Sequence, residues 1–208
     1  MKKSLILAAL FSCIPIFAKE ITVCVGAGEH WKAKSEPQFA IWLEDEKGNF
    51  VKTLYVTKKA SKKSFIFSPK EGRPESLPIW YNALKKVNGQ PTMDDFIEKN
   101  FVDAVTSATP KGGVIFKAEI ENKAYFINAE FNTSFDYNDF YTKKNSGVNG
   151  QPSVLYCAKI PADFGSSDGE ILLSLSGTGS VDGSDGFLHP DTSNLTTAKK
   201  IVQAVIVK

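Results

Sequence analysis

Residues 38–56 read QFAIWLEDEKGNFVKTLYV, and this stretch decides the fold class. In residues 38–44 the apolar side chains alternate between two faces, as they do in a strand with a period of two. Residues 45–49 are a cluster of turn formers, and residues 50–56 return to β-branched and aromatic side chains. The stretch therefore predicts a β-hairpin.

Further short runs of the same character lie on both sides of this hairpin, separated by clusters of Gly, Pro, Asn and Asp. Many short strands between turn clusters are typical of a sandwich of two sheets. We therefore predict an all-β, immunoglobulin-like β-sandwich. The additional strands are expected at residues 21–26, 64–67, 114–120, 124–132, 151–160, 170–176 and 200–207.

One segment, at about residues 76–100, has a helical rather than an alternating pattern. Ser76 is a suitable N-cap and Pro78 is tolerated in a first turn. Residues 92–97 resemble a second helix start. We expect a short helical insertion in the β domain. Its apolar positions fall at helical spacing, on Leu77, Trp80, Tyr81, Leu84 and Val87.

Residues 1–18 have the parts of a secretory signal peptide. Lys2 and Lys3 give a positive start, residues 5–17 are mainly apolar, and the small residue Ala18 ends the run. A bilayer span needs about 20 apolar residues, which this run does not reach. We expect cleavage after Ala18 and a periplasmic or secreted protein. Residues 19–208 then form a single domain.

Two other fates of the N-terminus stay open. The apolar run is retained as an anchor in one of them. In the other, residues 10–13 act as a loose lipobox and Cys13 is acylated, which makes the protein a lipoprotein. Cleavage after Ala18 is preferred because the apolar run continues past Cys13.

Export changes the charge of the chain. The full sequence has 25 basic and 23 acidic residues, and removal of Lys2 and Lys3 makes the two counts equal. A neutral domain offers no electrostatic basis for nucleic-acid binding. Residues 19–208 also contain no apolar run long enough to cross a membrane, so we expect no transmembrane segment after signal removal.

Cys24 and Cys157 are the cysteines that remain after such a cleavage. An oxidising envelope permits one disulfide between them. The alternative is a pair of buried free thiols that act as small apolar side chains. Sequence alone leaves both interpretations open.

Candidate metal and catalytic residues are few. Asp182 and Asp185 are weak candidates for Ca²⁺ ligands, because carboxylate oxygens suit that ion, but a turn uses the same residues for backbone reasons. We expect no metal site.

His30 and His189 are the histidines of the chain, and no Gly-x-Ser-x-Gly elbow accompanies them. We therefore name no catalytic residue.

Residues 103–109 resemble the motif at which FMN-binding domains are flavinylated outside the cytoplasm. The resemblance implies that a separate transferase esterifies an FMN phosphate to the hydroxyl of one threonine. Pro110 stands where the motif usually continues with Ser or Thr, and a strand-to-turn corner is the alternative interpretation. The matching positions are Asp103, Thr106, Ser107, Ala108 and the acceptor Thr109.

A broader resemblance covers residues 39–45, 51–54, 77–80 and 103–110. These segments look like a bacterial family of predicted periplasmic proteins of unknown function, often described by analogy with the flagellar hook-capping protein. The resemblance implies an immunoglobulin-like sandwich in the envelope. Residues 130–136 replace the Trp-Asp-Gly feature that this family usually has.

These patterns favour a non-enzymatic envelope β-sandwich that binds or scaffolds a partner. The expected partner is an envelope protein or a membrane-bound redox component. The alternative is an extracytoplasmic redox carrier with FMN covalently attached to Thr109. A third interpretation is a secreted hydrolase that uses His30 or His189.

Overall fold

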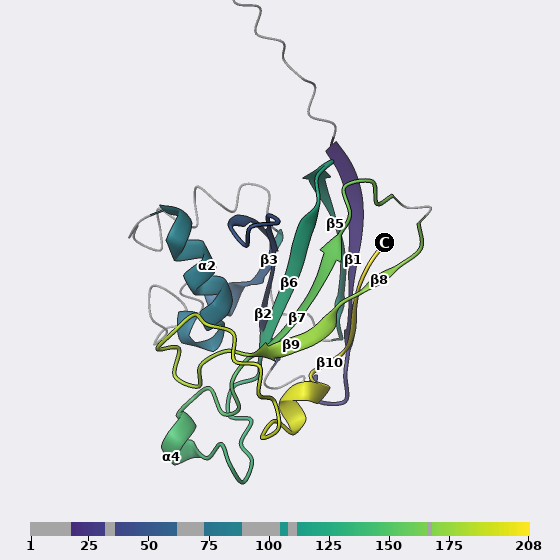
Figure 1. Ribbon diagram of the computed structural model, residues 1–208. Coiled ribbons are helices and arrows are strands. Elements are labelled where there is room, and N and C mark those ends of the chain that lie inside the picture. The colour runs from purple at the N-terminus through teal and green to yellow at the C-terminus, as the bar shows by residue number, and fades with distance from the viewer. Residues whose placement is uncertain (1–17, 32–35, 62–72, 89–104, 108–111, 166–167) are drawn as a thin grey trace, which may run out of the picture.

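The computed structural model describes residues 18–31, 36–61, 73–88, 105–107, 112–165 and 168–208. Two β-sheets pack face to face, and a helix covers the outer side of one of them (Figure 1). This arrangement confirms the predicted all-β, immunoglobulin-like sandwich with a short helical insertion.

The smaller sheet has four strands in the order β5-β1-β10-β8, and its neighbouring strands are antiparallel. Its strand β1 is longer than the predicted run at residues 21–26. The strands are β5 (Val114–Glu121), β1 (Ala18–Ala27), β10 (Val202–Val207) and β8 (Ile171–Leu172).

The larger sheet has six strands in the order β4-β3-β2-β6-β7-β9. The pairing of β2 with β3, from Ala40 opposite Val56 to Glu44 opposite Phe50, confirms the predicted hairpin. Only β3 and β4 run parallel among the described pairs. The strands are β4 (Val105–Ser107), β3 (Phe50–Thr57), β2 (Gln38–Glu44), β6 (Tyr125–Asn132), β7 (Val154–Ile160) and β9 (Ser174–Thr178).

The main core lies between the two sheets. On β1 every second residue from Ile21 to Val25 points into it, and on β2 the side chains of Phe39, Ile41 and Leu43 are fully buried. Phe39 stacks on Tyr55 with ring centroids 4.9 Å apart and on Phe131 at 5.1 Å. Offset aromatic pairs of this kind add stabilisation to the burial of apolar area.

A second apolar cluster lies on the outer face of the six-stranded sheet, under helix α2 (Pro78–Asn88). Trp42 from β2 and Trp80 and Leu84 from α2 are buried there. The helix confirms the first part of the predicted insertion, and residues 89–100 lie outside the described residues. None of the described helices is both long and apolar enough to cross a membrane.

The chain after β7 departs from the predicted single strand at residues 170–176. It forms β8 in one sheet and then β9 in the other. Leu173 lies at the crossover, is buried, and donates its N–H to the carbonyl oxygen of Val205 at 2.9 Å. The β8–β9 segment therefore joins the two sheets along one side.

The remaining short helices are α1 (Lys58–Ser61), η1 (Pro74–Ser76), α4 (Lys143–Ser146) and η2 (Thr197–Lys200).

Candidate functional site

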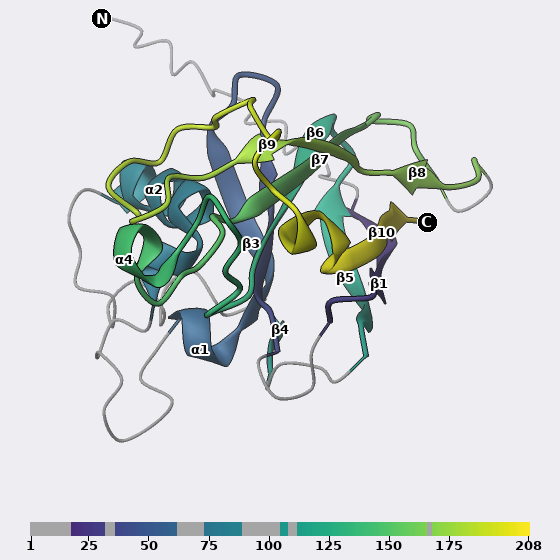
Figure 2. The same ribbon diagram turned by 90° about the horizontal axis from the view of Figure 1, so that it is seen from below.

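Two long connections meet at one end of the sandwich. Residues 133–153 link β6 to β7 and contain α4, and residues 179–201 link β9 to β10 and contain η2. Both lie at the lower end in Figure 1 and are seen together in Figure 2. We call this surface, residues 133–153 and 179–201, the loop face.

A buried polar network joins the two connections. Gln151 donates from Nε2 to Asp136 Oδ2 at 2.9 Å, and Thr197 Oγ1 donates to the same oxygen at 2.6 Å. The N–H of Thr196 donates to Gln151 Oε1 at 2.7 Å. Asp136 and Gln151 are buried. Because buried polar groups are costly to leave unpaired, these bonds fix the loops relative to each other.

Arg73 ties the segment before α2 into the same region. Its Nε pairs with Glu75 at 2.9 Å, while its Nη atoms donate to Ser134 and to Asn149 Oδ1. Asn149 Nδ2 in turn donates to the carbonyl oxygens of Glu75 and Val181, each at 3.1 Å. The guanidinium side chain is 12% exposed, so this is a largely buried joint rather than a surface ion pair.

The loop face also carries exposed apolar side chains. Phe135 is 59% exposed, Phe140 55%, Val148 49% and Phe187 70%. The N–H of Phe135 donates to the carbonyl oxygen of Val148 at 2.9 Å, so these two residues are neighbours. Phe135 is also the non-glycine residue with a positive φ, of 62°, in the described chain. A bulky residue in this region is strained, and such strain is retained where the surroundings fix the backbone.

An acidic pocket of about 420 Å³ opens between the two connections. Asp182, Asp185 and Asp191 line it together with Tyr141 and His189. The charge of Asp191 and, to a larger extent, burial raise the pKa of Tyr141. The pocket is therefore lined by both carboxylate groups and an aromatic ring.

The carboxylates in this pocket bond mainly to their own turns. Asp182 accepts the N–H of Ser184 at 3.0 Å, and Asp185 accepts that of Phe187 at 2.9 Å. Hydrogen bonds from Ser184 hold the pKa of Asp182 below its usual range. Across the residues that the structure describes, no three His, Cys, Asp or Glu side chains form a cluster able to hold a metal ion.

A hydrolytic triad is not assembled by the described residues. His189 Nε2 lies 3.2 Å from Asp185 Oδ1, whereas in a Ser–His–Asp triad that nitrogen faces the serine. Ser180 Oγ instead donates to the carbonyl oxygen of Asp185 at 2.9 Å. The other histidine, His30, has a buried Nδ1 without a hydrogen-bond partner. The hydrolase interpretation therefore gains no support from this geometry.

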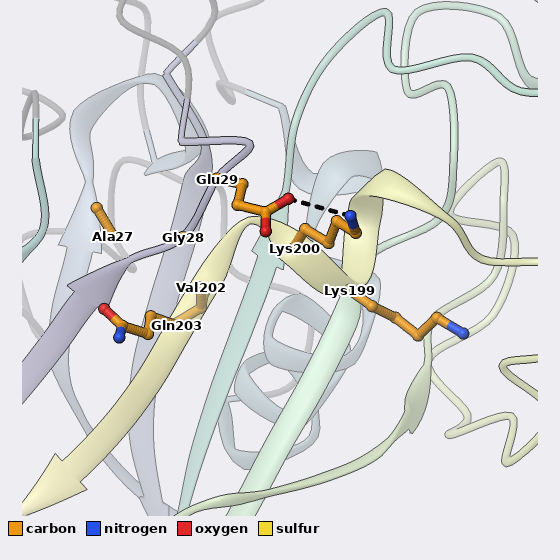
Figure 3. Close-up of a pocket in the computed structure, with 7 residues that line it drawn as sticks. All are labelled: Ala27, Gly28, Glu29, Lys199, Lys200, Val202 and Gln203. Atoms are coloured by element: carbon orange, nitrogen blue, oxygen red, sulfur yellow. Dashed lines mark hydrogen bonds and ion pairs between the residues drawn. The ribbon is translucent and has the colours of Figure 1, made fainter.

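A larger, open pocket of about 580 Å³ lies at the edge of the loop face, between the end of β1 and the start of β10. Lys200 and Glu29 form an exposed ion pair of 3.0 Å at its edge, and Lys199 points away from that pair (Figure 3). Gly28 lines the pocket, and a Cβ at this position would come within 2.2 Å of the Lys200 carbonyl oxygen. The pocket walls offer no group of catalytic residues.

The flavinylation segment falls mostly outside the described residues. Asp103, Ala108 and the expected acceptor Thr109 all lie there. Thr106 and Ser107 belong to β4, whose backbone pairs with β3 at the edge of the six-stranded sheet. The hypothesis of a covalent FMN stays a prediction.

Cys24 and Cys157 are free thiols. On β1 the neighbours Val23 and Val25 point into the main core, so Cys24 lies on the opposite, outer face. Cys157 lies on the outer face of the other sheet, because Tyr156 and Ala158 pack against the same core. Packed sheets are about 10 Å apart, which places the sulfurs beyond bonding distance. The interpretation as free thiols, rather than a disulfide, therefore fits this fold.

Burial, with a contribution from the charge of Glu44, raises the pKa of Cys157 to about 11. A thiol with so high a pKa is almost entirely protonated at neutral pH and is a poor nucleophile. Cys157 is thus a half-buried packing residue rather than a candidate for covalent chemistry.

Comparison of the chain with protein-family models, with curated proteins and with solved structures found no match.

Proposed function

We propose that this protein is exported and acts in the bacterial envelope as a non-enzymatic β-sandwich that binds or scaffolds a partner through its loop face. The partner class is an envelope protein or a membrane-bound redox component. The proposal rests on one observation: apolar side chains stay exposed on loops that are held by a buried polar network. Exposed apolar groups on a fixed surface are a common feature of binding sites.

Phe135 supports the proposal in particular. The residue is 59% exposed, although burial of a phenylalanine normally gains about 1.5–3 kcal/mol. Its backbone is strained, and the adjacent Asp136 is bound by Gln151 and Thr197. The fold thus tolerates a strained backbone at a residue whose side chain buries little area in the free protein. Aromatic anchors of this kind provide much of the affinity at protein interfaces.

Photo-crosslinking in cells tests this function. A benzophenone amino acid replaces Phe135 in one strain and Ile115 in another. Ile115 is the matched control because it is 73% exposed on β5 of the four-stranded sheet and lies outside the loop face. We expect a discrete crosslinked product in the envelope fraction from position 135 and none from position 115. A product from Ile115 alone would overturn the assignment of the loop face.

The second candidate function is an FMN carrier, and it is supported by the match of residues 103–109 to the flavinylation motif. Coexpression with a flavin transferase is expected to give a yellow fluorescent band on a denaturing gel. Thr109→Ala removes the only hydroxyl that could accept the flavin in this hypothesis, so the band should disappear. A band that persists in this variant rules out Thr109 as the attachment site.

A further inference from the structure

Glu130 is a fully buried carboxyl group in the middle of β6. It lies on the outer face of the six-stranded sheet, since its neighbours Ala129 and Phe131 point into the core between the sheets. Helix α2 covers this face. Burial of a carboxylate without a neighbouring cation is unfavourable unless other groups stabilise the charge or the group is protonated.

The carboxyl group binds the first turn of α2. Its Oε2 accepts the N–H of Trp80 at 2.8 Å, and its Oε1 accepts that of Ile79 at 3.3 Å. Ser153, just before β7, donates from Oγ to Oε1 at 2.6 Å. The N–H groups of a first helical turn have no partners within the helix, and the helix dipole favours negative charge there. Glu130 therefore caps a helix that begins 52 positions earlier in the chain.

The group is also packed against the start of the loop face. A Cβ on Gly179 would lie 2.5 Å from Ser153 Oγ, 2.6 Å from Pro78 Cγ and 3.2 Å from Glu130 Oε1. The N–H of Gly179 donates to the carbonyl oxygen of Ser153 at 3.1 Å. Gly179 also lines the acidic pocket. A movement of α2 away from Glu130 would thus change the packing behind that pocket.

No charged group among the described residues compensates the charge of Glu130. Burial raises the pKa of Glu130 to about 7, and the hydrogen bonds from Ser153, Trp80 and Ile79 offset only part of this effect. The charged side chains of the neighbouring segments interact with other groups or lie at the far end of α2. Arg73 and Glu75 pair with each other before α2, and Lys85 and Lys86 lie in its last turn. Asp182 accepts a hydrogen bond within its own turn, and Asp185 lies beside His189.

We propose that Glu130, Ser153 and the first turn of α2 form a proton-controlled latch. The neutral acid keeps α2 closed on the sheet, with Oε2 accepting the N–H of Trp80. Ionisation leaves a buried charge that the three hydrogen bonds and the helix N-terminus compensate only in part, and opening of α2 lets water reach it. The latch goes beyond the proposed binding function and stands whether or not the loop face has a partner.

Hydrogen exchange of the full chain tests the latch. Above the solvated pKa of a glutamate, each open state releases a proton that the closed state holds. After correction for the intrinsic pH dependence of exchange, we expect the opening of α2, read at Ile79 and Trp80, to increase about tenfold between pH 6 and pH 8. Glu130→Gln should show no such increase. Glu119→Gln, on the exposed side of β5, is the matched control and should behave like the wild type.

A second variant keeps the test valid if Glu130→Gln does not fold. Ser153→Ala removes a hydrogen bond that favours the ionised form, so the midpoint of the opening transition should move to higher pH. A ¹³C titration of the Glu130 carboxyl in the wild type should give the same midpoint as the exchange data. The latch is refuted if α2 opens independently of pH in the wild type, or if Glu130→Gln retains the wild-type pH dependence.

Discussion

Gly150 shows how a single residue holds the loop face in shape. It has a φ of +68° and forms an isolated β-bridge with Asp136. A Cβ at this position would meet the backbone nitrogen of Asp136 at 2.6 Å and its oxygen at 2.7 Å. Backbone atoms cannot move aside as a flexible side chain can. The position therefore requires glycine for both its conformation and its space.

We expect Gly150→Ala to lower the free energy of unfolding by about 3 kcal/mol or more, because strain and a backbone clash add together. Gly48→Ala is the matched control: Gly48 has a φ of +78° but nothing within 4 Å of its Cβ position, so only about 1 kcal/mol should be lost. Denaturant titration of both variants gives the comparison. Equal losses would show that the Asp136 bridge does not constrain the loop.

Glu130 makes the stability of the protein depend on pH. Its pKa is about 7 in the fold against an ordinary value of 4.5, so the folded state holds a proton that the unfolded state has released between these values. The free energy of unfolding falls as pH rises through this window, by roughly 3 kcal/mol in total, at 1.36 kcal/mol for each pKa unit. The sequence gives no sign of this burial, because a glutamate in an alternating strand predicts an exposed face.

Helix α2 illustrates what local pattern can and cannot predict. The spacing of Leu77, Trp80 and Leu84 correctly predicts the buried face, since a helical period is a local property. The predicted N-cap, Ser76, is wrong: α2 begins at Pro78, and Ser76 Oγ donates to the carbonyl oxygen of Arg73 at 2.6 Å. The cap comes from Glu130 on a distant strand, which no local rule can identify.

The β8–β9 segment shows the same limit for strands. Residues 170–176 read as one continuous strand, yet the chain leaves the four-stranded sheet after Leu172 and enters the six-stranded sheet at Ser174. Alternation specifies which side chains share a face, but both sheets accept that alternation. Only the packing of the two sheets decides where the strand crosses.

The sandwich as a whole was predictable because its core depends on repeated alternation in many strands. Inner-face residues from both sheets, such as Val23 and Phe39, are fully buried as the pattern requires. The loop face was not predictable, since its residues belong to connections far apart in sequence. Asp136, Gln151 and Thr197 meet only after the fold has formed. The signals in the sequence were single polar residues, which turns also use.

The two faces of the molecule also explain the free thiols. Cys24 and Cys157 lie on outer faces with the main core between them. The fold therefore places the two thiols apart, on opposite outer faces of the sandwich. Export and the position of the binding surface remain the two elements of the proposed function.

Retention in the envelope fraction tests that function by mutation. Phe135→Ser combined with Phe140→Ser removes two exposed rings of the loop face, and Ile115→Ser removes an exposed side chain of the four-stranded sheet as the control. Loss of two aromatic anchors, each worth about 1 kcal/mol or more, should lower the amount bound to isolated envelopes at least tenfold, while the control stays unchanged. Equal retention of the wild type and the double variant, with both correctly folded, would contradict the assignment of the loop face as the binding surface.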